Sequence, residues 1–226
     1  MNPEKRITKA QMKQDKLVIA ALKASEYVQK NKKYFLMGGG GVLAIAVILL
    51  IISYWSGKRA ADAVELFGKA QLSTAMGQTS LAIADYSTLV NEYGSTDVAA
   101  TACYLLADIY ARQNNFDSAA VYYQKYCDNF GNNKMLLAAA YAGLAVALEN
   151  KGDFARSAEN FMKAAKVADD ETTSPEYLAG AGRTFTKASQ YDKAVKAYQQ
   201  IIDRYNRSQY YSIARRKLAE LEYVKQ

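Results

Sequence analysis

Few side chains in this sequence have the chemistry of a catalytic or metal site. The 226 residues contain no histidine and only two cysteines. Without histidine the chain cannot form a Ser-His-Asp or Cys-His catalytic group, and two cysteines alone cannot hold a structural zinc ion. We therefore expect a protein that is not an enzyme and that uses no cofactor or metal.

Two short motifs resemble ligand sites, but their surroundings argue against that function. Gly180-Ala181-Gly182 matches part of a dinucleotide-binding loop, yet it falls inside an expected helix with no strand before it. The acidic run Asp169-Asp170-Glu171 lacks the spacing of a calcium-binding loop and is typical of a solvated turn. The chemistry that remains is that of charged and aromatic surface side chains, which serve in binding.

The longest apolar stretch, residues 34–56, separates a basic tail (residues 1–33) from the rest of the chain. Its 22 residues from Tyr34 to Trp55 carry no charge. A helix of that length is roughly 33 Å long, which matches the hydrocarbon core of a bilayer, so we expect a transmembrane helix. A buried core helix rarely stays uncharged for so long. A signal peptide cleaved at Ala61-Asp62-Ala63 would have a shorter apolar stretch.

The distribution of charge predicts how this helix is oriented. Residues 1–33 contain nine Lys and Arg against three acids, whereas residues 34–226 contain 20 against 19. The excess of positive charge places the N-terminus in the cytoplasm and residues 60–226 on the periplasmic side of a bacterial inner membrane. Because the basic residues flank a span, we expect anionic lipid as their partner and no nucleic acid.

The tail has features that suit a membrane surface. Residues 5–30 have the pattern of a basic amphipathic helix, which would lie on lipid or dock to a protein, and both interpretations stay open. A short set of residues next to the span is expected to contact the membrane surface: Lys30, Lys32, Lys33 and Trp55.

Beyond the apolar stretch the chain repeats itself four times. Each repeat has a small residue followed four positions later by an aromatic one, namely Tyr86, Tyr123, Phe161 and Tyr198. An earlier helix in three of the repeats carries a small residue, where we expect two helices to cross closely: Ala107, Ala145 and Gly182. Three repeats end in Tyr93-Gly94, Phe130-Gly131 and Tyr205-Asn206, which we interpret as left-handed helix ends.

This pattern resembles the tetratricopeptide repeat over residues 63–226. Repeats begin near residues 63, 100, 138 and 175, a spacing of 37–38 residues, where the family has about 34. The resemblance implies an all-α solenoid of about four helix pairs, with a capping helix at 208–225. The first repeat fits less well, because Lys69 stands where an apolar residue belongs.

A tetratricopeptide array binds proteins through the concave face of the first helices of its repeats. On this chain the resemblance assigns seven residues to that face: Tyr104, Asp108, Arg112, Glu149, Asn150, Arg183 and Lys187. Mixed charge with one aromatic ring suits a peptide or protein surface better than nucleic acid. The same residues would also suit a helix face that is only solvated, and the sequence leaves both interpretations open.

The layout of tail, span and repeat domain resembles the ancillary SecYEG translocon subunit (YfgM-like) family of bacterial inner membranes. That resemblance implies an adaptor that binds translocon subunits, chaperones or envelope proteins without turnover. A scaffold for cell division or outer-membrane assembly is the alternative. An organellar import receptor would place residues 60–226 in the cytosol, and the lysine-rich tail disfavours that topology.

Cys103 and Cys127 are expected near one another, because they fall at matching ends of two antiparallel helices. In an oxidising periplasm a well-oriented pair would form a disulfide. If Cys127 instead faces the next repeat, both are small buried core residues. The sequence leaves the two outcomes open.

Overall fold

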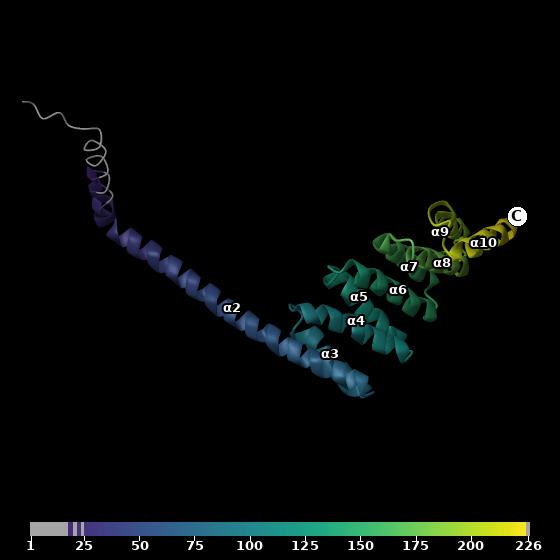
Figure 1. Cartoon of the computed structure of the whole chain (residues 1–226), viewed down its shortest axis with the longest axis horizontal. Coiled ribbons are helices and arrows are strands. Elements are labelled where there is room, and N and C mark those ends of the chain that lie inside the picture. The colour runs from purple at the N-terminus through teal and green to yellow at the C-terminus, as the bar shows by residue number, and fades with distance from the viewer. Residues whose placement is uncertain (1–17, 20–21, 24, 225–226) are drawn as a thin grey trace, which may run out of the picture. The chain divides into compact units, whose positions relative to one another are not determined.

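The structure is a computed structural model that describes residues 18–19, 22–23 and 25–224, and of residues 35–44 only the backbone. The chain divides into two compact units, Met1–Lys58 and Arg59–Gln226. Every element in the described part is a helix (Figure 1). Most of the amphipathic helix predicted at residues 5–30 lies outside the described residues.

Helix α2 (Lys32–Ala75) begins in the first unit and ends in the second. Across the described residues, none of the helices combines the length and the apolar character that crossing a membrane requires. The predicted span at 34–56 lies partly outside this description, because the side chains of residues 35–44 are not described. The side chains that follow them, from Ile45 to Trp55, are exposed.

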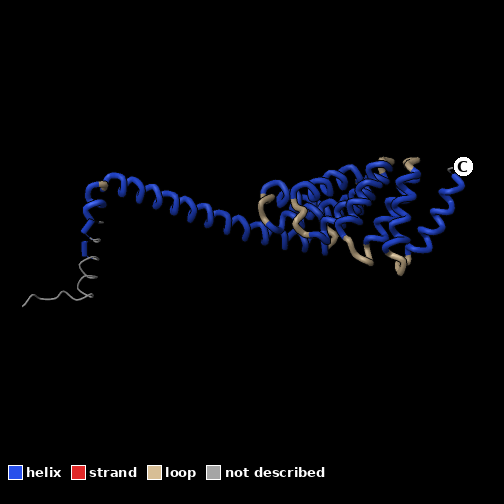
Figure 2. Tube along the Cα trace, turned by 90° about the horizontal axis from the view of Figure 1, so that it is seen from above, coloured by secondary structure: helices blue, strands red, loops and turns tan. Residues whose placement is uncertain are grey.

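The second unit is a stack of helices in which each one packs against the next along the chain. The last part of α2, from Arg59, pairs with α3 through the rings of Phe67 and Tyr86, whose centroids lie 5.9 Å apart. The loops between the helices are short (Figure 2). The helices after α2 are α3 (Thr79–Glu92), α4 (Asp97–Arg112), α5 (Phe116–Asn129), α6 (Lys134–Asn150), α7 (Phe154–Ala168), α8 (Ser174–Lys187), α9 (Tyr191–Arg204) and α10 (Tyr210–Val224). The all-α solenoid predicted from the repeats is confirmed.

Several of these helices begin at a polar side chain that satisfies a free backbone N–H group. The side chains of Asn115, Asn133 and Asp153 accept hydrogen bonds from backbone N–H groups three residues later, at 3.2, 3.1 and 3.2 Å. Pro175 stands in the first turn of α8, where no intrahelical N–H bond is lost. These local signals help to fix where α5, α6, α7 and α8 start.

The tight turns between the two helices of each repeat contain a residue in the left-handed region. It stands at corresponding positions in the four repeats, with φ of 73°, 60°, 80° and 56° at Gly77, Asn114, Gly152 and Ser189. The helix ends predicted at Tyr93-Gly94, Phe130-Gly131 and Tyr205-Asn206 are confirmed, since α3, α5 and α9 end one residue before each pair. The left-handed conformation expected there is wrong, because Gly94, Gly131 and Asn206 do not have positive φ. At Gly94 the constraint is steric, because a Cβ atom would lie 3.2 Å from the carbonyl oxygen of Val90.

The predicted helix crossings are confirmed. Ala107 and Ala145 are completely buried. A Cβ atom on Gly182 would lie 2.5 Å from Cζ of Tyr198, so only glycine fits against that ring. The sequence analysis missed a second contact of this kind, where a Cβ atom on Gly143 would lie 2.4 Å from Cζ of Tyr123 in the preceding repeat.

Lys69 proves compatible with the opening helix of the first repeat. Its side chain is 60% exposed, and its Nζ lies 3.8 Å from Oδ1 of the buried Asp85 on α3. The buried apolar positions of α2 are Ala63 and Ala70, which belong to the core of the stack. The end of α2 therefore serves as the first helix of the first repeat, with Lys69 outside the core.

Candidate binding groove

Three of the predicted groove residues form one charged cluster, which links the first helices of two neighbouring repeats. Glu149 on α6 accepts hydrogen bonds from Arg183 Nη1 and Lys187 Nζ on α8, the latter at 2.8 Å. The Glu149 side chain is only 12% exposed, whereas those of Arg183 and Lys187 are about half exposed. Two cations thus share one carboxylate across the boundary between two repeats.

The ionisation of Glu149 follows from this arrangement. Burial by itself raises the pKa of the carboxyl group, but the hydrogen bonds and charges of Lys187 and Arg183 outweigh it. The pKa of Glu149 therefore lies below its usual range, and the group is a carboxylate at neutral pH. With one negative and two positive groups, the cluster carries a net positive charge.

The predicted residues on α4 form a separate group. Arg112 Nε donates to Asp108 Oδ2 at 2.7 Å, one helical turn away. Tyr104 is half-buried, with its ring centroid 5.8 Å from that of Tyr123 and 6.0 Å from that of Tyr126. Its aromatic ring therefore also has a packing role.

Asn150, the remaining predicted groove residue, turns back on its own helix. Its Nδ2 donates to the carbonyl oxygen of Val146 at 2.9 Å. The structure thus joins three of the seven predicted residues in one cluster and pairs two others within α4. Whether the set binds a protein stays a prediction.

A pocket of about 220 Å³ lies beside the cluster, between α8, α9 and α10. Arg183 and Lys187 form one wall, and Tyr198 lies at the level of the buried core. Burial raises the pKa of Tyr198 to about 12, opposed by Arg183 and assisted by Glu220. The hydroxyl group of Tyr198 is therefore close to the charged groups that line the pocket.

Another wall of the pocket comes from α10, and the sequence analysis missed that this helix contributes to the site. Lys217, Glu220 and Leu221 line the pocket, and Lys217 Nζ lies 2.6 Å from Glu220 Oε2. We expected this helix to be only a cap. The signal was its position directly after a second helix, which is the place of a first helix in a further repeat.

Both cysteines are free thiols in this structure, and a disulfide between them in an oxidising compartment stays a prediction. Cys103 is buried and its Sγ donates to the carbonyl oxygen of Tyr122 at 3.3 Å. Cys127 lies near Tyr141 on α6, whose pKa it helps to raise, so it faces the next repeat. Burial raises the pKa of Cys103 to about 11 and that of Cys127 to about 12.

The predicted membrane-surface residues belong to the first unit. Lys30, Lys32, Lys33 and Trp55 are all exposed, and their contact with lipid stays a prediction. In the described part of the chain, no group of three or more acidic, cysteine or histidine side chains is placed to hold a metal ion.

The fold and the groove define a class: an α-helical repeat protein whose stacked helix pairs present a continuous surface for other proteins. Family models described as tetratricopeptide repeat match residues 67–134, 138–171 and 180–208. The chain is a tetratricopeptide repeat protein, and repeats of this kind are protein-interaction modules. No curated protein matches the chain.

Two solved structures have a similar fold. The crystal structure of BtubC (BKLC) from P. vanneervenii has a TM-score of 0.51 and 19% sequence identity, covering 71% of this chain and 64% of that one. The crystal structure of the apo form of RapI has a TM-score of 0.53 and 15% identity, covering 71% of this chain and 48% of that one. The chain thus spans less than two thirds of both proteins, and the likeness concerns the fold alone.

Proposed function

We propose that this chain is a membrane-anchored adaptor that binds segments of other proteins in the groove formed by α4, α6, α8 and α10. The observation that carries the proposal is the cluster of Glu149, Arg183 and Lys187. Its two cations are partly exposed, share one carboxylate and line a pocket, so they are available to a carboxylate of a partner. The repeat scaffold supports a binding function, because tetratricopeptide repeats are protein-interaction modules.

The uncharged stretch at residues 34–56 supports a membrane anchor, with Lys30, Lys32, Lys33 and Trp55 at the membrane surface. The basic tail supports a cytoplasmic N-terminus and a periplasmic repeat domain. On this basis the adaptor is an accessory subunit of the secretion translocon and its chaperones, as the resemblance to the YfgM-like family implies. A scaffold for cell division or envelope assembly is the alternative.

Site-specific crosslinking tests the groove and its partners. A photoreactive residue replaces Thr186, which lines the pocket between Arg183 and Lys187 without taking part in their ion pairs. We expect crosslinks to translocon subunits or chaperones in intact membranes, identified by mass spectrometry. Crosslinks to division or envelope-assembly proteins would favour the alternative scaffold.

Charge reversal then separates binding in the groove from mere proximity. Arg183→Glu with Lys187→Glu should abolish these crosslinks, while Lys196→Glu, on the exposed side of α9, should leave them unchanged. Equal crosslinking in all three proteins would rule out the groove.

Protease added to spheroplasts should digest residues 60–226, and full protection of that part would contradict the proposed topology.

A further inference from the structure

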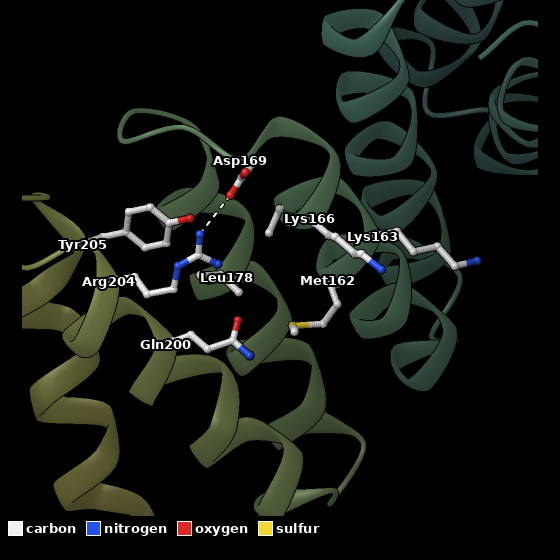
Figure 3. A pocket seen from close by; sticks show the side chains of 9 residues that line it. Met162, Lys163, Lys166, Asp169, Leu178, Gln200, Arg204 and Tyr205 are labelled. Atoms are coloured by element: carbon white, nitrogen blue, oxygen red, sulfur yellow. Dashed lines mark hydrogen bonds and ion pairs between the residues drawn. The ribbon is translucent and has the colours of Figure 1, made fainter. Parts of the chain in front are cut away.

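A second cleft lies between α7 and α9, the second helices of the last two repeats, and so on a different surface from the groove. Its volume is about 590 Å³. Met162 and the buried Leu178 provide apolar side chains in the cleft, and Gln200 projects from α9 (Figure 3). The cleft thus combines an apolar floor with polar walls.

The walls carry more positive than negative charge. Lys163 and Lys166 from α7 and Arg204 from α9 line the cleft, with Asp169 as the single carboxylate. Arg204 is held in place: its Nη2 lies 2.9 Å from Asp169 Oδ1, and its guanidinium carbon lies 5.3 Å from the ring centroid of Tyr205. Figure 3 shows this pair at the edge of the cleft. An anchored guanidinium group loses little conformational freedom when it binds an anion.

The preceding repeat shows why this cleft is open. Tyr141 on α6 stands at the position that Leu178 occupies on α8. The Tyr141 ring centroid lies 5.5 Å from Lys163 Nζ on α7, and the pKa of Tyr141 is raised by burial and by nearby Cys127 and Asp128 on α5. An aromatic ring therefore fills the space between α5 and α7. On α8 the equivalent residue is Leu178, which has no ring, and the cleft lies over it.

The charge differs between the repeats as well. Lys166 stands where the second helices α5 and α9 carry Asp128 and Asp203, and where α3 carries Asn91. At this position α5 and α9 therefore carry a negative charge where α7 carries a positive one. The side-chain amides of Gln124 and Gln199 donate to the two carboxylates at 2.8 Å. Of the two spaces α5–α7 and α7–α9, the second joins an open apolar floor to a cationic wall.

We propose that this cleft binds an acidic segment of a partner protein, with one apolar side chain inserted over Leu178 and Met162. Carboxylates on either side of that side chain would pair with Lys166 and Arg204. Charge complementarity supports this occupant, since Lys166 and Arg204 line the cleft and Asp169 is the one carboxylate among its lining residues.

The experiment selects ligands without assuming a sequence. Random peptides of about 12 residues, displayed on phage, are selected on the full-length chain and depleted on two variants. Leu178→Tyr fills the cleft as Tyr141 fills its neighbour, and Lys166→Asp introduces the residue found at this position in α5 and α9. We expect enrichment of peptides in which an apolar residue is flanked by Asp or Glu.

A synthetic peptide from the selection should bind either variant roughly tenfold more weakly than the wild-type chain, and more weakly in high salt. The groove variant Arg183→Glu with Lys187→Glu should bind it unchanged, which separates this cleft from the proposed groove. Lys166→Asp changes an exposed side chain and should fold normally, so the test does not depend on Leu178→Tyr being folded. Enrichment of neutral or basic peptides, or binding of the peptide by both variants as tightly as by the wild-type chain, would overturn the proposal. As a second readout, the wild-type chain and Lys166→Asp are tested on phosphatidylglycerol vesicles, and a variant that loses vesicle binding but keeps peptide binding would also overturn it.

Discussion

At the scale of single residues, a glycine can be required by its backbone conformation or by the lack of space for a side chain. Gly152 and Gly68 test the effect of backbone conformation alone. A Cβ atom on either glycine would meet nothing within 4 Å. Gly152 has φ of 80° in a turn, whereas Gly68 lies within helix α2. Adding the same methyl group should therefore have opposite effects at the two positions.

Gly152→Ala should lower the free energy of unfolding by about 1 kcal/mol, because an L-residue is strained in the left-handed region. Gly68→Ala should raise it by roughly 0.5–1 kcal/mol, because alanine loses less entropy in a helix. Urea unfolding followed by circular dichroism measures both. Two changes of the same sign would contradict the explanation by backbone conformation.

Gly182 tests the effect of the room available for a side chain. Gly182→Ala would place its Cβ 2.5 Å from Cζ of Tyr198 and should cost about 1–3 kcal/mol of stability. In a background of Tyr198→Leu, which removes the ring, the same substitution should cost much less. A double-mutant cycle by chemical unfolding measures this coupling, and additive effects would mean that the ring does not impose the glycine.

At the scale of elements, the first helices of neighbouring repeats are joined by ion pairs as well as by apolar packing. Glu149 on α6 links to α8 through Arg183 and Lys187. On the second helices, Arg204 at the end of α9 links to Asp169 at the end of α7. Both links cross a repeat boundary, so they depend on the angle at which repeats stack.

The lowered pKa of Glu149 predicts a specific pH dependence. A carboxyl group whose pKa is lower in the folded state stabilises the fold above its ordinary pKa, and this contribution is lost as pH falls through the folded value. Glu149→Gln should therefore lower the Tm at pH 7, and the difference from wild type should shrink when the pH falls below about 4.5. Thermal unfolding at several pH values measures it. A difference that stays constant with pH would show that Glu149 acts through packing.

At the scale of the whole molecule, the described core belongs entirely to the second unit. The buried apolar residues run from Ala63 to Leu221, and all lie within Arg59–Gln226. Repeat proteins are stabilised by contacts within repeats and between neighbours, so this part needs no contact with the first unit to fold.

A chain of residues 59–226 should accordingly be helical, monomeric and cooperatively unfolding without detergent. Circular dichroism and size-exclusion chromatography measure this. Its matched partner, a chain beginning at residue 79, lacks the first helix of the first repeat and exposes Tyr86 and Leu89, so it should be less stable or aggregate. If both chains were equally stable, the end of α2 would not be part of the first repeat.

The sequence by itself determined the repeat, because small and aromatic residues recur at positions fixed by helix geometry. Ala107, Ala145 and Gly182 could be assigned to helix crossings for the same reason. The sequence pattern placed the left-handed residues at the wrong positions. A glycine after a helix can be required by positive φ, or by a carbonyl oxygen that leaves no room for a Cβ atom, as at Gly94. Such alternatives look alike in one sequence.

Tertiary structure decided which side chains meet across repeats. Arg183 and Glu149 are 34 residues apart, and their contact depends on how α8 stacks on α6 rather than on any local pattern. The same holds for the part of α10 in the groove and for the open cleft over Leu178. The repeat period aligns equivalent positions, but only the packing angle and the size of each side chain determine whether the space between two helices is filled.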